Sequence, residues 1–255
     1  MLLPSVPRLN ALVVGATQGI GLEFVKQLLQ ESRIEHLFAT YRSSQTADAL
    51  LSLAQAHPQK LHCLPMDLTQ EDQIQTGIAQ LSAIAPNLHF AINCVGLLHN
   101  ETQQPEKALR QLNTENLLHY FHVNSIGPAL LAKHLLTVLK HSEPSLFATI
   151  SAKIGSISDN RIGGWYGYRA SKAALNMFLK TASIEYRRRS PKTTIVMLHP
   201  GTTDTGLSKP FQRGVPPEKL FSTERTVSQL LSVLSDVKAE DSGEFFSWDG
   251  ARLPF

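Results

Sequence analysis

The chain has 255 residues, of which 42% are hydrophobic and 18% are charged, and its net charge at pH 7 is +3. This composition excludes a disordered chain and a charge-rich nucleic-acid-binding module, and the length is sufficient for one domain with a large core. The two cysteines, Cys63 and Cys94, form no C-x-x-C pair, which indicates reduced thiols in a cytoplasmic protein. No apolar stretch approaches the roughly 20 residues of a membrane span, and the first ten residues lack the apolar region of a signal peptide.

Strand-like and helix-like segments alternate from one end of the chain to the other. The predicted strands cover residues 11–15, 36–41, 62–66, 89–94, 146–151, 194–198 and 244–247. The predicted helices cover residues 19–29, 47–56, 71–84, 116–140, 166–187 and 223–235. This α/β alternation predicts a single doubly wound Rossmann domain over residues 1–255, with a seven-stranded parallel sheet and helices on both faces. Segment 201–220, rich in proline and glycine, is expected to be a mobile loop over the site.

A glycine-rich turn, Gly15-Ala16-Thr17-Gln18-Gly19-Ile20-Gly21, follows the first predicted strand. Its glycines let the backbone approach a pyrophosphate, and the helix that follows offers unpaired N–H groups and a favourable dipole. A glycine triplet alone would equally suit a tight packing turn. The strand before it and the helix after it favour a dinucleotide site.

Ligands of such sheets bind where the strands end, so the residues at the strand ends carry information about the cofactor. The second strand ends at Arg42 with no acid to hold two ribose hydroxyls, which favours the 2′-phosphate of NADP(H) over NAD(H). A solvated loop arginine is the alternative. Asp67 either accepts a hydrogen bond from an adenine amino group or caps the next helix. Asn93 and Gly96 follow the fourth strand, where a glycine lets the chain pass close to a ribose.

Tyr168 and Lys172 lie four residues apart in a predicted helix, so their side chains share one face. A neighbouring ammonium favours the phenolate, and the pKa of Tyr168 is therefore expected to fall from about 10 toward neutrality. Such a phenol can donate a proton to a carbonyl oxygen or accept one from an alcohol. Tyrosine and lysine at this spacing are also common in surface packing, so the pair gains meaning only beside the glycine turn.

Together these motifs resemble the short-chain dehydrogenase/reductase family, along the whole chain and in that family's order. Segment 15–21 is similar to the family's cofactor turn. Asp67 is similar to its adenine-side aspartate, and segment 93–96 to its Asn-Ala-Gly strand end. Segment 200–205 resembles the one that holds the nicotinamide carboxamide. The resemblance implies a cofactor bound by Gly15, Thr17, Gln18, Gly19, Ile20, Gly21, Arg42, Asp67, Leu68, Asn93, Gly96, Tyr168, Lys172, Pro200, Gly201, Thr203 and Thr205.

The same resemblance implies the roles of the catalytic residues. Segment 121–127 is similar to the helix that carries the family's catalytic asparagine, which falls on Asn124. Tyr168 would protonate the alkoxide that forms when a carbonyl accepts hydride from the nicotinamide. Lys172 would lower the pKa of that tyrosine and bind the nicotinamide ribose, and Asn124 would hold a water that connects the lysine to solvent.

One branch of the family is most similar to this chain, and one catalytic position differs from the family pattern. Segments 165–176 and 242–253 are most similar to the carbonyl-reductase-like branch that includes C-factor and Sniffer-type reductases. The family has a serine pair after the fifth strand, whose second member is catalytic, and this chain has Ser151-Ala152 instead. Ser151 is therefore expected to polarise the carbonyl, with Ser156 as the reserve.

The expected function is NADP(H)-dependent hydride transfer to or from an aldehyde, ketone or quinone. The G-x-S-x-G pentad of serine hydrolases and the G-x-x-x-x-G-K-[ST] loop of nucleotide triphosphatases are absent. The alternative is a catalytically weak dinucleotide-binding protein with a signalling or assembly role.

The expected partner is a small-molecule carbonyl or alcohol, with no nucleic acid, membrane or metal. No cluster of cysteines or carboxylates accompanies the ten scattered histidines. Trp165, Leu207 and Phe211 suggest an apolar substrate, although loop aromatic residues also pack on the body of a protein. Helices 116–140 and 166–187 are apolar enough to form a homodimer or homotetramer, or else to face their own sheet.

Overall fold

The computed structural model describes residues 2–255, and its main feature is a parallel sheet of seven strands in the order β3-β2-β1-β4-β5-β6-β9. The strands are β1 (Leu9–Val14), β2 (Ile34–Tyr41), β3 (Leu61–Pro65), β4 (Phe90–Asn93), β5 (Ser145–Ile150), β6 (Thr193–His199) and β9 (Glu244–Ser247). The chain order reverses between β1 and β4, which neighbour each other in the sheet although two strands separate them in sequence. This reversal is the switch point at which doubly wound sheets bind their ligands. The predicted fold class is confirmed.

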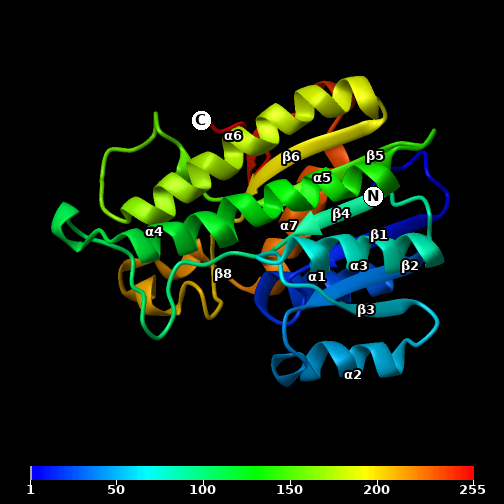
Figure 1. Ribbon diagram of the computed structural model, residues 1–255, viewed down its shortest axis with the longest axis horizontal. Coiled ribbons are helices and arrows are strands. Elements are labelled where there is room, and N and C mark those ends of the chain that lie inside the picture. The colour runs from blue at the N-terminus through cyan, green and yellow to red at the C-terminus, as the bar shows by residue number, and fades with distance from the viewer. Residues whose placement is uncertain (1) are drawn as a thin grey trace.

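Helices cover both faces of the sheet (Figure 1). They are α1 (Gly19–Gln30), α2 (Asp48–Ala56), α3 (Glu71–Ile84), α4 (Thr114–Phe121), α5 (Gly127–Leu139), α6 (Tyr166–Arg189) and α7 (Thr223–Asp236). Successive side chains of a strand point to opposite faces. In β1, Ala11 and Val13 therefore join the core under α1 and α7, whereas Leu12 and Val14 join the core under α3, α5 and α6.

Segment 116–140, predicted as one helix, is divided in the structure. A π-helical turn, His122–Ile126, joins α4 to α5, and Pro128 stands in the first turn of α5. A π turn adds a residue to the ladder of hydrogen bonds, and such turns often occur at functional sites. Asn124 lies in this turn and is fully buried.

Segment 201–220, predicted as a mobile loop, contains short regular elements. Strand β7 (Thr202–Thr203) pairs in parallel with β8 (Leu220–Phe221), and two 3-10 helices, Lys209–Gly214 and Pro217–Lys219, lie between them. With segments 97–112 and 152–165, it surrounds the edge at which the strands end, on the left of Figure 1.

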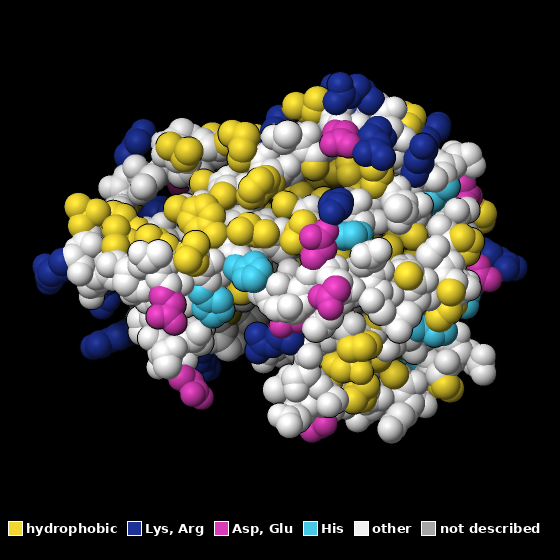
Figure 2. Space-filling model, viewed as in Figure 1, with side chains coloured by type: hydrophobic (Ala, Val, Ile, Leu, Met, Phe, Trp, Pro, Cys, Tyr) yellow, Lys and Arg dark blue, Asp and Glu magenta, His cyan; other side chains and the backbone are white. Residues whose placement is uncertain are grey.

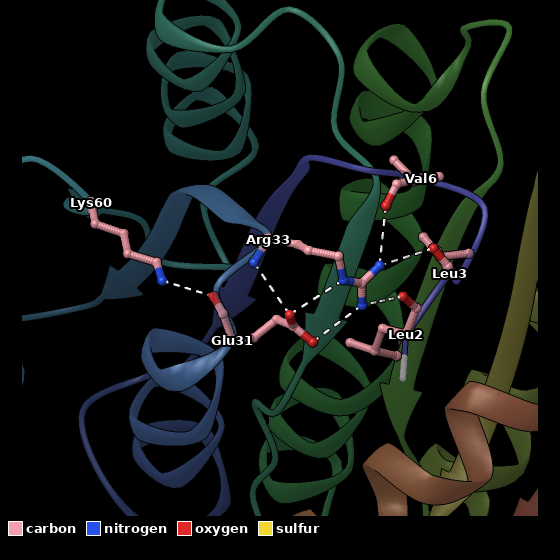
Figure 3. A network of polar contacts seen from close by, with 6 residues as sticks. All are labelled: Leu2, Leu3, Val6, Glu31, Arg33 and Lys60. Carbon is pink, nitrogen blue, oxygen red and sulfur yellow. Dashed lines mark hydrogen bonds and ion pairs between the residues drawn. The ribbon is translucent and has the colours of Figure 1, made fainter.

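A network of polar contacts around Arg33 fixes the N-terminal segment to the opposite edge of the sheet (Figure 3). The Arg33 guanidinium donates hydrogen bonds to the carbonyl oxygens of Leu2, Leu3 and Val6 and to the Glu31 carboxylate. The hydrogen bonds from the Arg33 side chain hold the pKa of Glu31 below its usual value.

Several large apolar side chains are exposed on α4, the π turn and α6. They are Leu118, Ile126, Met177, Phe178 and Ile184. Figure 2 shows hydrophobic side chains gathered along the band that these elements form in Figure 1. Among residues 2–255, no helix combines the length and the apolar character that crossing a membrane requires.

Candidate active site

The glycine turn between β1 and α1 has the geometry of an anion-binding site. Gly15 has a φ of +79°, and a side chain at Gly21 would overlap the carbonyl oxygen of Gly15. The Gly15 N–H donates to the Thr40 hydroxyl on β2, which fixes the start of the turn. The N-cap residue Gln18 makes no side-chain hydrogen bond to α1 among the described residues, so the first N–H groups of the helix are available to an anion. Thr17, Gln18, Gly19 and Ile20 form the outer part of this turn.

The ends of β2 and β3 present one cation and one anion. Arg42 is exposed and makes no hydrogen bond or ion pair with any residue between 2 and 255. Asp67 is half-buried, and its Oδ1 accepts hydrogen bonds from the Thr69 backbone N–H (2.9 Å) and hydroxyl (2.8 Å). Asp67 therefore closes a local turn before α3, which begins at Glu71, and Leu68 is buried beside it.

The end of β4 brings two predicted catalytic residues together. A Cβ built on Gly96 would lie 3.6 Å from Lys172 Nζ and 3.9 Å from Asn124 Oδ1. Asn124 accepts a hydrogen bond from the Leu97 N–H (2.7 Å) and donates to the Leu97 carbonyl (2.8 Å). Asn93 is fully buried, and its Nδ2 has no partner among the described residues.

Tyr168 and Lys172 lie on the same face of α6, as predicted, with Lys172 Nζ 5.9 Å from the centre of the tyrosine ring. The Lys172 ammonium donates to the Ile150 carbonyl (3.0 Å), and burial lowers its pKa to about 8. The Tyr168 hydroxyl forms no hydrogen bond with the described residues. Burial, and secondarily Tyr120, raise the pKa of Tyr168 above its usual value.

The expectation of a lowered tyrosine pKa is therefore wrong for this structure. The i, i+4 argument considered the attraction of the ammonium, but loss of water affects both groups. Burial disfavours the phenolate and the ammonium alike. At neutral pH, Tyr168 keeps its proton, which is the state that a proton donor requires.

The two serines considered for the third catalytic role both make hydrogen bonds to residues other than Tyr168. Side chains two apart in β5 face the same way, so Ser151 lies on the α6 side with Phe147 and Thr149. Its hydroxyl donates to Asn176 Oδ1 at 2.7 Å. Ser156 is buried and accepts a hydrogen bond from the Asp159 N–H (3.2 Å). Ala152 packs in the same apolar cluster as Tyr168.

Segment 200–205 closes the site from the side of β6. Pro200 is buried, Gly201 has a φ of +73°, and the Thr203 hydroxyl pairs with Thr226 at 2.9 Å. Thr205 Cγ2 lies 3.2 Å from a Cβ built on Gly19, so this segment contacts the glycine turn.

An aromatic wall covers Tyr168. The Trp165 ring packs edge-on against Phe211 (4.8 Å between centres) and Tyr168 (6.2 Å), and Phe211 also contacts His99 (5.6 Å). The remaining apolar neighbours in this cluster are Leu97, Leu98, Tyr120, Ala152, Ile154 and Leu207. Trp165, Leu207 and Phe211, which suggested an apolar substrate in the sequence, therefore meet at Tyr168.

Sequence motifs missed two kinds of residue in this site. Asn176, which binds Ser151, follows Lys172 by one helical turn, and that spacing is a signal that could have revealed it. Tyr120 and Glu106, both buried behind Tyr168, belong to no such pattern. Tyr120 donates to the Leu98 carbonyl (2.6 Å), and Glu106 accepts from the Gly167 N–H (3.1 Å).

Three residues of a metal-binding type lie together at the opposite edge of the sheet: His89, His141 and Glu143. His89 Nδ1 accepts a hydrogen bond from the Asn10 N–H (3.1 Å), so Nε2 carries the proton and faces Glu143 at 3.1 Å. In this arrangement His89 has no free lone pair for a metal ion.

Comparison with known proteins gives concordant results. A family model described as short chain dehydrogenase matches residues 9–215. The solved NADPH-bound carbonyl reductase from chicken fatty liver is 30% identical, with 97% of this chain and 100% of the other covered and a TM-score of 0.86. The carbonyl reductase Sniffer of D. melanogaster is 27% identical at the same coverage and TM-score. The C-signal protein of Myxococcus xanthus is 30% identical over 58% of this chain and 84% of its own.

Proposed function

Because the chain belongs to the short-chain dehydrogenase family, we propose that it is an NADP(H)-dependent carbonyl reductase of aldehydes, ketones or quinones. One observation carries the proposal: Tyr168, Lys172 and Asn124 lie close together beside the end of β4, and all three are buried. In this proposal residues 1–255 form one domain that both binds the cofactor and carries out the reaction.

The glycine turn and the strand ends fit a dinucleotide. The uncapped start of α1 suits the pyrophosphate, and the unpaired Asn93 Nδ2 supplies a donor at the end of β4. Lys172 has spare N–H donors for the nicotinamide ribose, because among residues 2–255 only the Ile150 carbonyl accepts a hydrogen bond from its ammonium. When bound, the cofactor supplies the hydride.

Tyr168 donates the proton in the proposed reaction. Its raised pKa keeps the hydroxyl protonated, and no protein group competes for that proton. Lys172 stabilises the phenolate left after transfer, since both side chains lie on one face of α6. Asn124 holds the loop at Leu97 and, in this proposal, a water that returns a proton through Lys172.

Ser151 remains our candidate for the hydroxyl that polarises the carbonyl. Its proton is directed to Asn176 Oδ1, while Asn176 Nδ2 is buried without a partner. Rotating the Asn176 amide by half a turn would let Nδ2 donate to Ser151 and release the serine proton. Ser156 remains the second candidate for this role.

The preference for NADP(H) rests on the unpaired Arg42 and on the absence of an acid beside it. A guanidinium binds a phosphate through paired, charge-assisted hydrogen bonds. Arg42→Ala should weaken NADPH binding by about 1.5–3 kcal/mol and leave NADH binding nearly unchanged. Fluorescence titrations with both cofactors measure this difference, and tighter binding of NADH by the wild-type protein would refute the preference.

The aromatic wall favours an apolar substrate. The side chains that cover the Tyr168 ring, among them Trp165, Leu207 and Phe211, are apolar, so they suit an apolar substrate better than a charged one. A panel of aldehydes, ketones and quinones, each assayed with NADPH, tests both the reaction and this ranking.

A signalling role without strong catalysis is the second candidate, because the C-signal protein is among the relatives. Cofactor binding with no turnover of any panel member would favour it. In either case the apolar band on α4 and α6 is suited to a homodimer or homotetramer, which sedimentation measures directly.

A further inference from the structure

We propose that Glu106 is a positioning residue that fixes Tyr168 by capping the start of α6 from a distant loop. The inference deepens the proposed reductase function and rests on it. Glu106 lies in segment 97–112, about sixty residues before the helix that it caps, and only 2% of its surface is exposed.

The N-terminus of α6 has no cap of its own. Trp165, at the capping position, is in the left-handed region (φ 54°, ψ 44°), and its side chain accepts no hydrogen bond from the helix. A helix start leaves four N–H groups to be satisfied, and a buried one requires a partner from elsewhere. Glu106 provides two such acceptors.

The backbone and the side chain of Glu106 accept hydrogen bonds from two different N–H groups. The Glu106 carbonyl oxygen accepts from the Trp165 N–H, which holds the aromatic wall. The Glu106 carboxylate accepts from the Gly167 N–H at 3.1 Å, one residue before Tyr168. A carboxylate at a helix N-terminus is also favoured by the helix dipole.

The Glu106 carboxylate packs closely against Gly167, where a side chain would not fit. A Cβ built on Gly167 would lie 3.0 Å from Glu106 Oε1 and would collide with the Tyr120 ring. Oε1 itself is buried with no partner among the described residues. The negative charge contributes to the raised pKa of Tyr120, which burial mainly causes and which is about 12. A buried carboxylate with one unpaired oxygen is costly, and a role in positioning explains why the site keeps it.

The loop that carries Glu106 is anchored at its start and closed by hydrogen bonds within itself. Leu97 and Leu98 are bound by Asn124 and Tyr120, and Gln111 Oε1 accepts from the Lys107 and Ala108 N–H groups. The loop therefore provides a fixed point for α6. The orientation of the Tyr168 hydroxyl depends on the first turn of that helix.

Four variants test the proposal, with kcat expressed per NADPH-binding site. Glu106→Ala removes the side-chain cap but leaves the Trp165 contact, so kcat should fall about 10- to 100-fold with KM for NADPH within about threefold of wild type. Glu106→Gln keeps an acceptor for Gly167 and should stay within about threefold in kcat. In Glu106→Asp the side chain is too short to reach Gly167, so this variant should behave like Glu106→Ala. It replaces Glu106→Ala in the test if the alanine variant does not fold. Glu101→Ala, exposed in the same loop, is the matched control.

Hydrogen exchange provides a readout that is independent of turnover. The amides of residues 167–171 should exchange faster in Glu106→Ala and Glu106→Asp than in wild type, Glu106→Gln or Glu101→Ala. Wild-type kcat in Glu106→Ala and Glu106→Asp, or equal losses in Glu106→Gln and Glu106→Ala, would overturn the proposal. Unchanged exchange would also overturn it. A wild-type protein that reduces no carbonyl would instead refute the proposed function, while the exchange data still report on the cap.

Discussion

Polar groups are paired differently at the two ends of the parallel strands of the main sheet, and each of these ends is called an edge below. Where the strands begin, polar side chains are paired: Arg33 binds three carbonyl oxygens, and Lys60 donates to the carbonyls of Leu29 and Glu31. Where the strands end, the described residues offer buried Lys172 no counter-charge and the Tyr168 hydroxyl no hydrogen-bond partner.

Unpaired buried atoms follow the same division among the described residues. Around the ends of the strands they are Asn93 Nδ2, Glu106 Oε1, Thr149 Oγ1, Asn176 Nδ2 and His199 Nδ1. Around the beginnings they are Asn10 Oδ1 and His141 Nδ1, and the remaining one, Gln229 Oε1, lies on α7. Buried polar groups without partners destabilise a fold, so their concentration at one edge marks where a ligand is expected to complete the pairing.

The largest expected effect is that of Tyr168→Phe at the edge with unpaired groups. The change removes the acidic hydroxyl and keeps the ring, so folding and NADPH binding should survive while carbonyl reduction falls by about 10²–10⁴-fold. Steady-state rates and NADPH titration of the same preparation measure both. Combined with Lys172→Met, the loss should be smaller than the product of the two single losses, because the residues act as a pair. A Tyr168→Phe protein that keeps the wild-type rate would refute the dehydrogenase assignment.

Ser151→Ala should have the next largest effect. If the Ser151 hydroxyl polarises the carbonyl, turnover should fall about 10²–10³-fold, as for the loss of one oxyanion donor. Ser156→Ala is the control and should be mild. The reverse result would transfer the role to Ser156. Two mild variants would mean that Tyr168 alone binds the carbonyl oxygen, and Ala152→Ser would then be expected to increase turnover.

The free-energy cost of burying the Lys172 ammonium can be measured from the pH dependence of the free energy of unfolding. Burial lowers its pKa from 10.5 to about 8. Between these values the unfolded chain binds more protons than the folded one, so stability rises with pH in that window. Without cofactor, the free energy of unfolding of wild type relative to Lys172→Met should rise by roughly 3 kcal/mol from pH 8 to pH 10.5. Urea unfolding at several pH values tests this, and parallel curves for the two proteins would contradict it.

The sequence was sufficient to predict the features that depend on local patterns. Apolar runs and glycines located all seven strands of the main sheet, and the i, i+4 rule placed Tyr168 and Lys172 on one face. The π turn at Asn124 was not predictable, because a continuous apolar period does not show one extra residue. The pKa of Tyr168 was predicted in the wrong direction, because the spacing of two residues in a helix does not show how deeply they are buried.

Arg33→Met should have the smallest effect, and it tests the edge with paired groups. The change leaves the carbonyls of Leu2, Leu3 and Val6 without their donor, so the free energy of unfolding should fall by about 1–3 kcal/mol. Activity per folded molecule should not change, because these groups lie across the sheet from Tyr168. Arg8→Met is the control: Arg8 is largely exposed in its pair with Glu35, and its loss should cost less than about 1 kcal/mol. If Arg33→Met lowered kcat of the folded protein while Arg8→Met did not, the two edges would be coupled and the division of roles between them would not hold.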